Sequence, residues 1–470
     1  MTYFPKPPFS LNDKKNGDRK ILNYFKRSDC SRFQFLSNKT RKQISKLKLD
    51  KDKDLFKEQK KIFEIWPLIL TDALRELKRN DPREWDDPKD EKIGTFFDET
   101  SLGVTKLRDV LTGFSDFEGM MYGASPDRYR DHVVHSFRVW IIGHGILKTC
   151  LRRKLNISSE FDDLIKPIEW ECMWAIAALC HDIGYPLSHI ENVNKKARDA
   201  LLNQGLMPKG NLRFDFSAQM QIFNDTMIRL MASKPAKLPE ALQPQRTNST
   251  NDSGEEKRRI YVTHLQNKYY LKLLRSFDEL EHGVVSSLLL SKSLVYFLES
   301  DFCHDDWSPL TKEDARQFLI RREILRAMAN HTCQDVYHLK FNTLSFLLYI
   351  VDEIQCWGRP TLEKLQHESA DIQHGKAYVG EFSETRINVK ITTEDKEWNE
   401  DHKKGVKAWV GRLRKMLRLA VGTPEYKSNN LYLRFEAQNQ KNQHCYLELK
   451  GGRLIGPTRV QLKRKHKPKR

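Results

Sequence analysis

Apolar positions recur at helical spacing through most of the chain up to about residue 370. Intervals of three and four residues, or apolar residues on every side of a segment, are typical of helices packed into a core. We expect helices over residues 57–79, 132–152, 168–183, 216–232, 262–278, 281–299, 312–331 and 341–356. The pattern therefore predicts a mainly α protein with a helical domain over residues 61–370.

The period of the apolar pattern changes after about residue 380. ETRINVKITT (384–393) alternates as a strand does, and NLYLRFEAQNQKNQHCYLELKGG (430–452) has the pattern of a hairpin. Between them, HKKGVKAWVGRLRKMLRLA (402–420) is a basic amphipathic helix whose charged side is typical of a solvated face but could also follow a phosphate backbone. We expect a small α+β domain over residues 380–455.

One internal segment and the two ends differ from the rest in composition. Residues 233–258 are rich in Pro, Ser, Asn and charge, which predicts a mobile insertion in the helical domain. Residues 1–60 form a basic N-terminal segment and residues 456–470 a basic tail. Residues 1–50 hold thirteen Lys or Arg against four Asp, and residues 459–470 hold seven Lys or Arg and no acid.

The net charge of +18 is therefore partly concentrated at the two ends. Basic ends bind nucleic acid in some proteins and only aid solubility in others, so the sequence leaves both possibilities open. The eight cysteines form no CxxC pair, which indicates reduced thiols. The first twenty residues are polar, and the longest apolar runs are too short to span a bilayer. We expect a soluble, cytoplasmic protein without membrane contact, which could be an oligomer.

The stretch ALCHDIGYPLSH (178–189) carries the first candidate chemistry. It places His181 and Asp182 at the end of WECMWAIAALC (170–180), a segment that is apolar on all sides and should be buried. Gly184 and Pro186 indicate that the helix ends there. Because an unpaired buried charge is strongly destabilising, the pair must either be satisfied by other protein groups or hold a metal.

Four other predicted helices direct a histidine or an aspartate towards the core. The residues concerned are His132 and His135 on one helix, then His282, His331 and Asp352. A single histidine on an apolar face is more often a hydrogen-bonded core residue than a ligand, but repeated coincidences favour a shared site. Imidazole nitrogen and carboxylate oxygen suit a divalent transition metal.

The ordered set resembles the H…HD…D signature of the HD-domain metal-dependent phosphohydrolases. With two further histidines it is similar to the extended pattern of two-metal members, such as cyclic-nucleotide phosphodiesterases and HD-GYP proteins. The matching residues are His135, His181, Asp182, His282, His331 and Asp352. The resemblance covers roughly residues 115–360 and implies an all-helical, HD-type domain.

The resemblance also implies a ligand set and a reaction. One divalent ion would be bound by His135, His181, Asp182 and Asp352, and Asp182 would bridge to a second ion held by His282 and His331. Mn, Fe, Co, Ni, Zn or Mg are candidates for one or two sites. The implied function is hydrolysis of a nucleotide or related phosphate ester by attack of a metal-bound hydroxide.

Several assignments stay open at this stage. His132 shares a face with His135 and competes with it as first ligand, although His135 is preferred. Arg130 and Arg359 are candidates for binding the substrate phosphate. HDIGYPLSH also resembles a stretch of deoxynucleoside-triphosphate triphosphohydrolases, in which His189 would be catalytic together with Asp182; a structural role for His189 is the alternative.

Two further alternatives complete the expectations. CHDDWSP (303–309) contains a second His-Asp pair, His304 and Asp305, but its polar, proline-ended context predicts a solvated turn. The other function considered is a regulatory or nucleic-acid-binding protein whose HD domain is not catalytic. A complete ligand set favours the enzyme.

Overall fold

A computed structural model describes a large part of the chain. The described residues are 33–47, 55–81, 97–113, 132–149, 164–188, 198–199, 201–203, 217–242, 260–299, 307, 309–336, 343–355, 375–382, 386–393, 410–411, 413, 432–439, 444–450 and 453–455. The following sequence predictions lie outside them: Arg130, His189, His304, Asp305, Arg359, the basic tail and most of the basic N-terminal segment.

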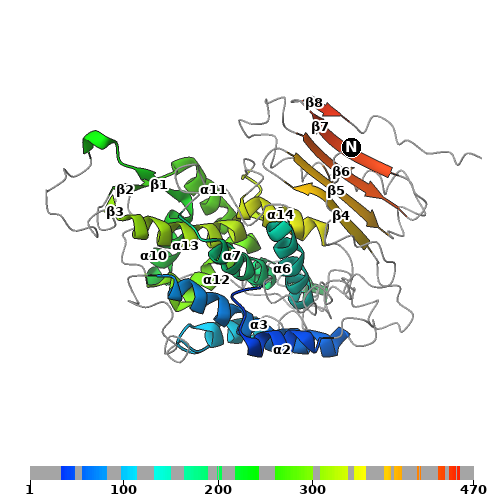
Figure 1. Ribbon diagram of the computed structural model, residues 1–470, viewed down its shortest axis with the longest axis horizontal. Helices are drawn as coiled ribbons and strands as arrows, with labels where there is room; N and C mark the ends of the chain where they lie inside the picture. The colour runs from blue at the N-terminus through cyan, green and yellow to red at the C-terminus, as the bar shows by residue number, and fades with distance from the viewer. Residues whose placement is uncertain are drawn as a thin grey trace, which may run out of the picture.

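The described chain is mainly helical, as the apolar pattern predicts (Figure 1). Its α-helices include α2 (Asn38–Ser45), α3 (Leu55–Arg79), α6 (His132–Thr149), α7 (Pro167–Cys180), α10 (Ala218–Ala232), α11 (Asn267–Asp278), α12 (His282–Ser293), α13 (Lys312–Asn330) and α14 (Leu344–Ile354), and residues 104–113 are also helical. The short helix α8 (Tyr185–Ser188) follows α7 directly. None of the described helices is both long and apolar enough to cross a membrane.

Helix α7 lies in the middle of the helical domain. Every residue from Glu169 to Cys180 is buried, and the helix packs against α3, α6 and α13. The indole of Trp174 donates to the carbonyl of Trp140 on α6 at 2.7 Å, and Trp66 on α3 donates to the carbonyl of Leu179 at 3.0 Å. These bonds hold the end of α7 in one position, because each satisfies a polar group that would otherwise be buried unpaired.

Capping residues define where the neighbouring helices begin. Thr311 precedes α13 and accepts from the Asp314 amide at 3.1 Å, while the Asp314 carboxylate accepts from the Thr311 amide at 3.0 Å. This reciprocal capping box fixes the start of α13. Thr343 caps α14 by accepting from the Phe346 amide at 3.3 Å. The phase of each helix, and hence the direction of its polar side chains, follows from these starts.

A three-stranded antiparallel sheet accompanies the helices. Its order is β1 (Ser233–Lys237), β2 (Tyr261–Leu265) and β3 (Pro309–Leu310). The helix expected over 262–278 therefore begins only at Asn267, because Tyr261–Leu265 contains Val262 and Thr263, which favour strands, and pairs with β1. The segment expected to be a mobile insertion likewise starts in a paired strand, and its residues 243–258 lie outside the described ranges.

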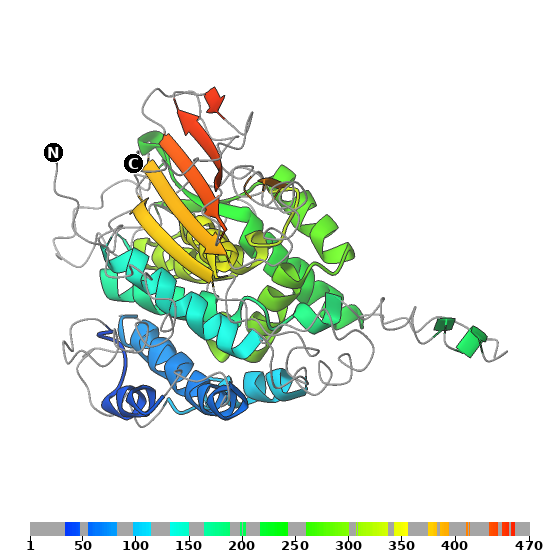
Figure 2. The same ribbon diagram turned by 90° about the vertical axis from the view of Figure 1, so that its right-hand side faces the viewer.

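The later part of the chain forms a five-stranded sheet. Its order is β4 (Gly375–Phe382), β5 (Arg386–Thr393), β6 (Tyr432–Gln438), β7 (His444–Lys450) and β8 (Arg453–Ile455). The expected strand and hairpin correspond to β5 and to β6–β7, and alternate residues of that hairpin are buried. In both views the sheet and helices α2 and α3 lie on opposite sides of the helical domain (Figure 1, Figure 2).

One connection in this sheet bears on the expected basic helix. Strands β5 and β6 are parallel, and such a pair needs a long crossover rather than a tight turn. The predicted helix at 402–420 falls within that connection, but only Val410, Gly411 and Leu413 of it are described, with Leu413 buried.

Candidate metal centre

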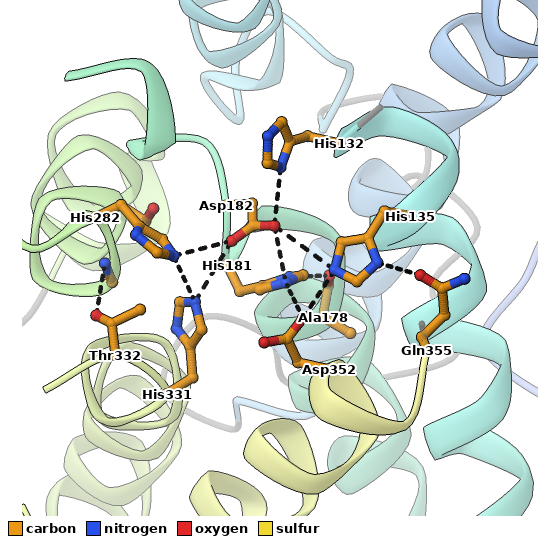
Figure 3. A network of polar contacts seen from close by, with 12 residues as sticks. His132, His135, Ala178, His181, Asp182, His282, His331, Thr332, Asp352 and Gln355 are labelled. Atoms are coloured by element: carbon orange, nitrogen blue, oxygen red, sulfur yellow. Dashed lines mark hydrogen bonds and ion pairs between the residues drawn. The ribbon is translucent and has the colours of Figure 1, made fainter. Parts of the chain in front are cut away.

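Asp182 is the centre of a buried cluster of imidazole and carboxylate groups (Figure 3). It follows His181, the residue that ends α7. Its Oδ1 atom lies 3.3 Å from Nε2 of His282, the first residue of α12, and 3.4 Å from Nε2 of His331, which ends α13. The two Nε2 atoms are 3.1 Å apart. Three helix ends therefore meet at one carboxylate oxygen.

The second oxygen of Asp182 faces a different group of ligand atoms. Oδ2 lies 3.3 Å from Nε2 of His181 and 3.6 Å from Nε2 of His135 on α6. Asp352 of α14 completes this side, because its Oδ1 is 2.9 Å from His135 Nε2 and 3.8 Å from His181 Nε2. The structure thus brings together all six residues that match the sequence pattern, from five different helices or their ends.

The histidine ring orientations are set by hydrogen bonds on the opposite nitrogen. Nδ1 of His181 donates to the carbonyl of Ala178 at 2.8 Å, and Nδ1 of His331 donates to that of Met328 at 2.5 Å. Nδ1 of His135 similarly contacts the side-chain oxygen of Gln355. A neutral imidazole that donates through Nδ1 presents a lone pair at Nε2. This is the arrangement of metal-binding histidines, whose other nitrogen is held by a carbonyl or carboxylate.

Nε2 of His181 shows why a cation fits here. The atom is buried and has no hydrogen-bond partner among the described residues, yet carboxylate oxygens of Asp182 and Asp352 lie nearby. An atom that faces two carboxylates needs a positive charge beside it, which either a proton on the ring or a bound cation supplies. Burial lowers the pKa of His181, but the Asp182 and Asp352 carboxylates outweigh it and raise that pKa to about 10. The local potential is therefore strongly negative.

The pKa values of two neighbouring groups follow from the same balance. Burial raises the pKa of Asp182, but the charge of His181 and the hydrogen bonds from His132 and His282 outweigh this effect and hold that pKa well below its usual value. Burial lowers the pKa of His282 to about 4. His282 is therefore a neutral nitrogen donor at physiological pH, the form that binds metals.

Two glycines allow the helix ends to come this close. A Cβ on Gly184 would lie 2.7 Å from the Ser286 amide nitrogen of α12, and the Gly184 amide donates to Ser286 Oγ at 2.8 Å. A Cβ on Gly283 would lie 2.5 Å from both Met328 O and Thr332 Oγ1, at the end of α13. Neither position can accept a side chain without separating the histidines that the two helices carry.

The donor atoms form two overlapping groups that could hold a metal ion. One consists of His135, His181 and Asp182, the other of Asp182, His282 and His331, and within each group the ligand atoms lie within 4.8 Å of one another. Imidazole and carboxylate donors without a thiolate suit divalent transition metals. The residues fit one ion or two, with Asp182 common to both groups.

His132 occupies a different place from His135. Its Nδ1 lies 3.0 Å from Asp182 Oδ2, and its ring packs against Tyr185 with a centroid distance of 4.1 Å. It belongs to neither group of possible ligands among the described residues, whereas His135 does. His132 instead faces a pocket of about 350 Å³ that opens on the cluster. The described lining residues are His132, Asp182, Tyr185, Ser188, Glu279, Leu280, Glu281, His282, His331, Thr332, Gln334, Asp352 and Glu353.

Some site residues were not anticipated from the sequence. Gln355, which holds His135, lies three positions after Asp352 and so on the same helical face, a spacing that could have indicated it. Tyr185 lies within HDIGYPLSH (181–189), and its ring contacts those of His132 and His282. The pocket wall at Glu279–Glu281 had no sequence signal, because it depends on the turn between α11 and α12.

Comparison with known proteins adds no relative to this picture. No family model matches the chain, and no curated protein and no solved structure shows a significant match to it. The functional argument therefore depends on the residues themselves.

Proposed function

We propose that this protein is an HD-type metal-dependent phosphohydrolase that acts on a nucleotide or a related phosphate ester. The observation that supports this most directly is that two sets of imidazole and carboxylate ligands share Asp182, which lines a pocket. A structural metal site is normally closed by protein ligands, whereas a catalytic site keeps a position open for substrate and water. The open pocket beside the cluster favours the catalytic alternative.

Each described residue has a defined task in this proposal. Asp182 would help to hold the cations, while Ala178, Met328 and Gln355 keep the histidine Nε2 atoms directed inward. Bound divalent cations would neutralise phosphate charge and lower the pKa of water to give a nucleophile at neutral pH. Mn, Fe, Co, Ni, Zn and Mg remain the proposed metals, one or two per chain, because the ligand types do not separate them.

The remaining predicted residues are close in sequence to described residues of the site. Arg130 precedes His132 by two positions, His189 follows the pocket residue Ser188, and Arg359 lies four positions after Gln355. We retain Arg130 and Arg359 as candidates for phosphate binding and His189 as a candidate catalytic residue. A cytoplasmic location is part of the same proposal, supported by the buried free thiols of the described cysteines Cys172, Cys180, Cys333 and Cys445.

Metal analysis and a substrate screen test this function. The purified protein should contain at least one equivalent of a divalent metal and, when loaded, hydrolyse at least one of three classes: cyclic nucleotides, deoxynucleoside triphosphates or simple phosphomonoesters. Metal at one hundred times its Kd should raise the free energy of unfolding by about 2.7 kcal/mol. Asp182→Ala should remove both this stabilisation and all hydrolysis.

His264→Ala is the matched control, because His264 makes an edge-to-face contact with Trp307 and is not among the described residues that line the pocket. It should keep wild-type metal content and activity. Hydrolysis by Asp182→Ala at the wild-type rate would rule out the proposal. A chain that binds less than one metal and cleaves none of the three classes would support the non-catalytic, regulatory alternative instead.

A further inference from the structure

The pocket that opens on the cluster has an acidic wall. Apart from the cluster residues Asp182 and Asp352, its described lining contains the carboxylates of Glu279, Glu281 and Glu353. No Lys or Arg belongs to that described lining. The lining also offers the imidazole of His132, the hydroxyls of Tyr185, Ser188 and Thr332 and the amide of Gln334.

The turn between α11 and α12 holds this wall in place. The amides of Glu279 and Leu280 donate to the carbonyls of Arg275 and Phe277, and the Glu281 amide donates to that of Ser276 at 2.9 Å. The Ser276 hydroxyl also donates to the Glu281 carboxylate. Leu280 has a φ of 50°, a conformation that costs energy for a residue with a side chain. The bonds on both sides of Leu280 offset that cost, so Glu279 and Glu281 stay at the pocket.

The charge of the wall limits how much negative charge a substrate can bring. Cations held by the cluster would compensate the charge of the phosphoryl group at the reacting bond. A second or third phosphate would extend beyond them and lie against the carboxylates of Glu279 and Glu281. Like charges in a partly enclosed pocket repel much more strongly than in water.

The size of the pocket supports the same conclusion. Its volume of about 350 Å³ is near the lower end of the range for small-molecule sites. That volume suits one phosphate with a nucleoside. Carboxylates, hydroxyls and an amide are also groups that bond sugar hydroxyls and base amino groups.

We propose that the preferred substrate carries a single phosphoryl group, as a monoester or cyclic diester, on a nucleoside-sized polar group, and that Glu279 and Glu281 select against polyphosphates. The proposal rests on the phosphohydrolase function above. It assigns the Glu279–Glu281 turn as a specificity determinant in addition to the metal ligands. Glu279, the exposed member, is the residue to vary, since Glu281 adjoins the proposed ligand His282.

The test compares a nucleoside 5′-monophosphate, its 3′,5′-cyclic monophosphate and its 5′-triphosphate. Wild-type kcat/KM for at least one of the first two should exceed that for the triphosphate by about tenfold or more. Glu279→Lys should raise kcat/KM for the triphosphate by about fivefold and change the other values less than about twofold. Titration calorimetry, with and without Mn²⁺, should show the same shift in Kd.

Glu64→Lys is the charge-matched control, because Glu64 is exposed on α3 and does not line the pocket. It should leave the ratio of substrates unchanged. Metal-dependent preference of the wild type for the triphosphate would overturn this inference and leave the phosphohydrolase function standing. An unchanged ratio in Glu279→Lys would overturn the role of the turn. Absence of hydrolysis of all three compounds by metal-loaded protein would overturn this inference, and the wider substrate screen would then decide the general function.

Discussion

The two ends of α7 both bury charge, but they compensate it differently. At the N-terminal end, the Glu169 carboxylate pairs with Arg316 of α13 and accepts from the Lys166 amide at 2.7 Å. Arg316 also donates to the carbonyl of Asn80 at 3.1 Å. At the C-terminal end, Asp182 faces imidazoles instead of a guanidinium.

The difference separates a structural charge from one arranged for a ligand. A guanidinium is permanently charged and gives a buried carboxylate a positive partner from the protein itself. Imidazoles held through Nδ1 direct Nε2 at the carboxylates, where the positive charge can come from a proton or from an added cation. Buried charge is therefore not a sign of function in itself; the sign is a set of donors that the protein leaves without a permanent positive partner.

The largest effect is expected from a change at the N-terminal end of α7, where the buried charge is structural. Arg316→Leu should lower the free energy of unfolding by about 3–5 kcal/mol, because it leaves the carboxylate of Glu169 buried without its partner. Chemical denaturation measures this value. The double variant Arg316→Leu, Glu169→Leu should recover most of the loss, since no buried charge remains. Failure of the double variant to recover would show that packing of Arg316, not its charge, matters.

An intermediate effect is expected where α12 and α13 meet. Gly283→Ala should cost about 1–3 kcal/mol of stability, since its Cβ would be forced against the end of α13, and it should weaken metal binding by separating His282 from His331. Thermal unfolding and metal titration measure the two effects. Gly113→Ala is the matched control, because nothing lies within 4 Å of a Cβ there. Equal stability and equal metal affinity of the two variants would contradict the close approach of Gly283 to the end of α13.

The smallest expected effect concerns the support of His135. Gln355→Leu removes the acceptor of the His135 Nδ1–H and should weaken metal affinity about tenfold, or about 1.4 kcal/mol. Gln355→Glu keeps an acceptor and should restore affinity. Competition with a chromogenic chelator measures both. If Gln355→Leu bound metal as tightly as the wild type, Gln355 would have no part in orienting the ligand.

The sequence predicts the helices and the composition of the cluster because both depend on local spacing. His282, His331 and Asp352 each follow an apolar pattern within their own helix, so their inward direction needs no knowledge of the fold. Strand β2 was missed because its residues continue the apolar pattern of α11, the helix that follows it. Only pairing with β1, which a local pattern does not show, makes this segment a strand. The pocket wall was missed for a related reason, since it depends on a turn held by Ser276.

The helix directions around Asp182 also give the site an electrical polarity. Helices α7 and α13 end at His181 and His331, so the partial negative charge of their C-terminal carbonyls adds to the field at the cluster and stabilises a cation there. Helix α12 begins at His282, whose Nε2 faces the same oxygen of Asp182 as that of His331, so its N-terminal amides bring partial positive charge to the cluster as well. The backbone thus places helix ends of both signs around one carboxylate.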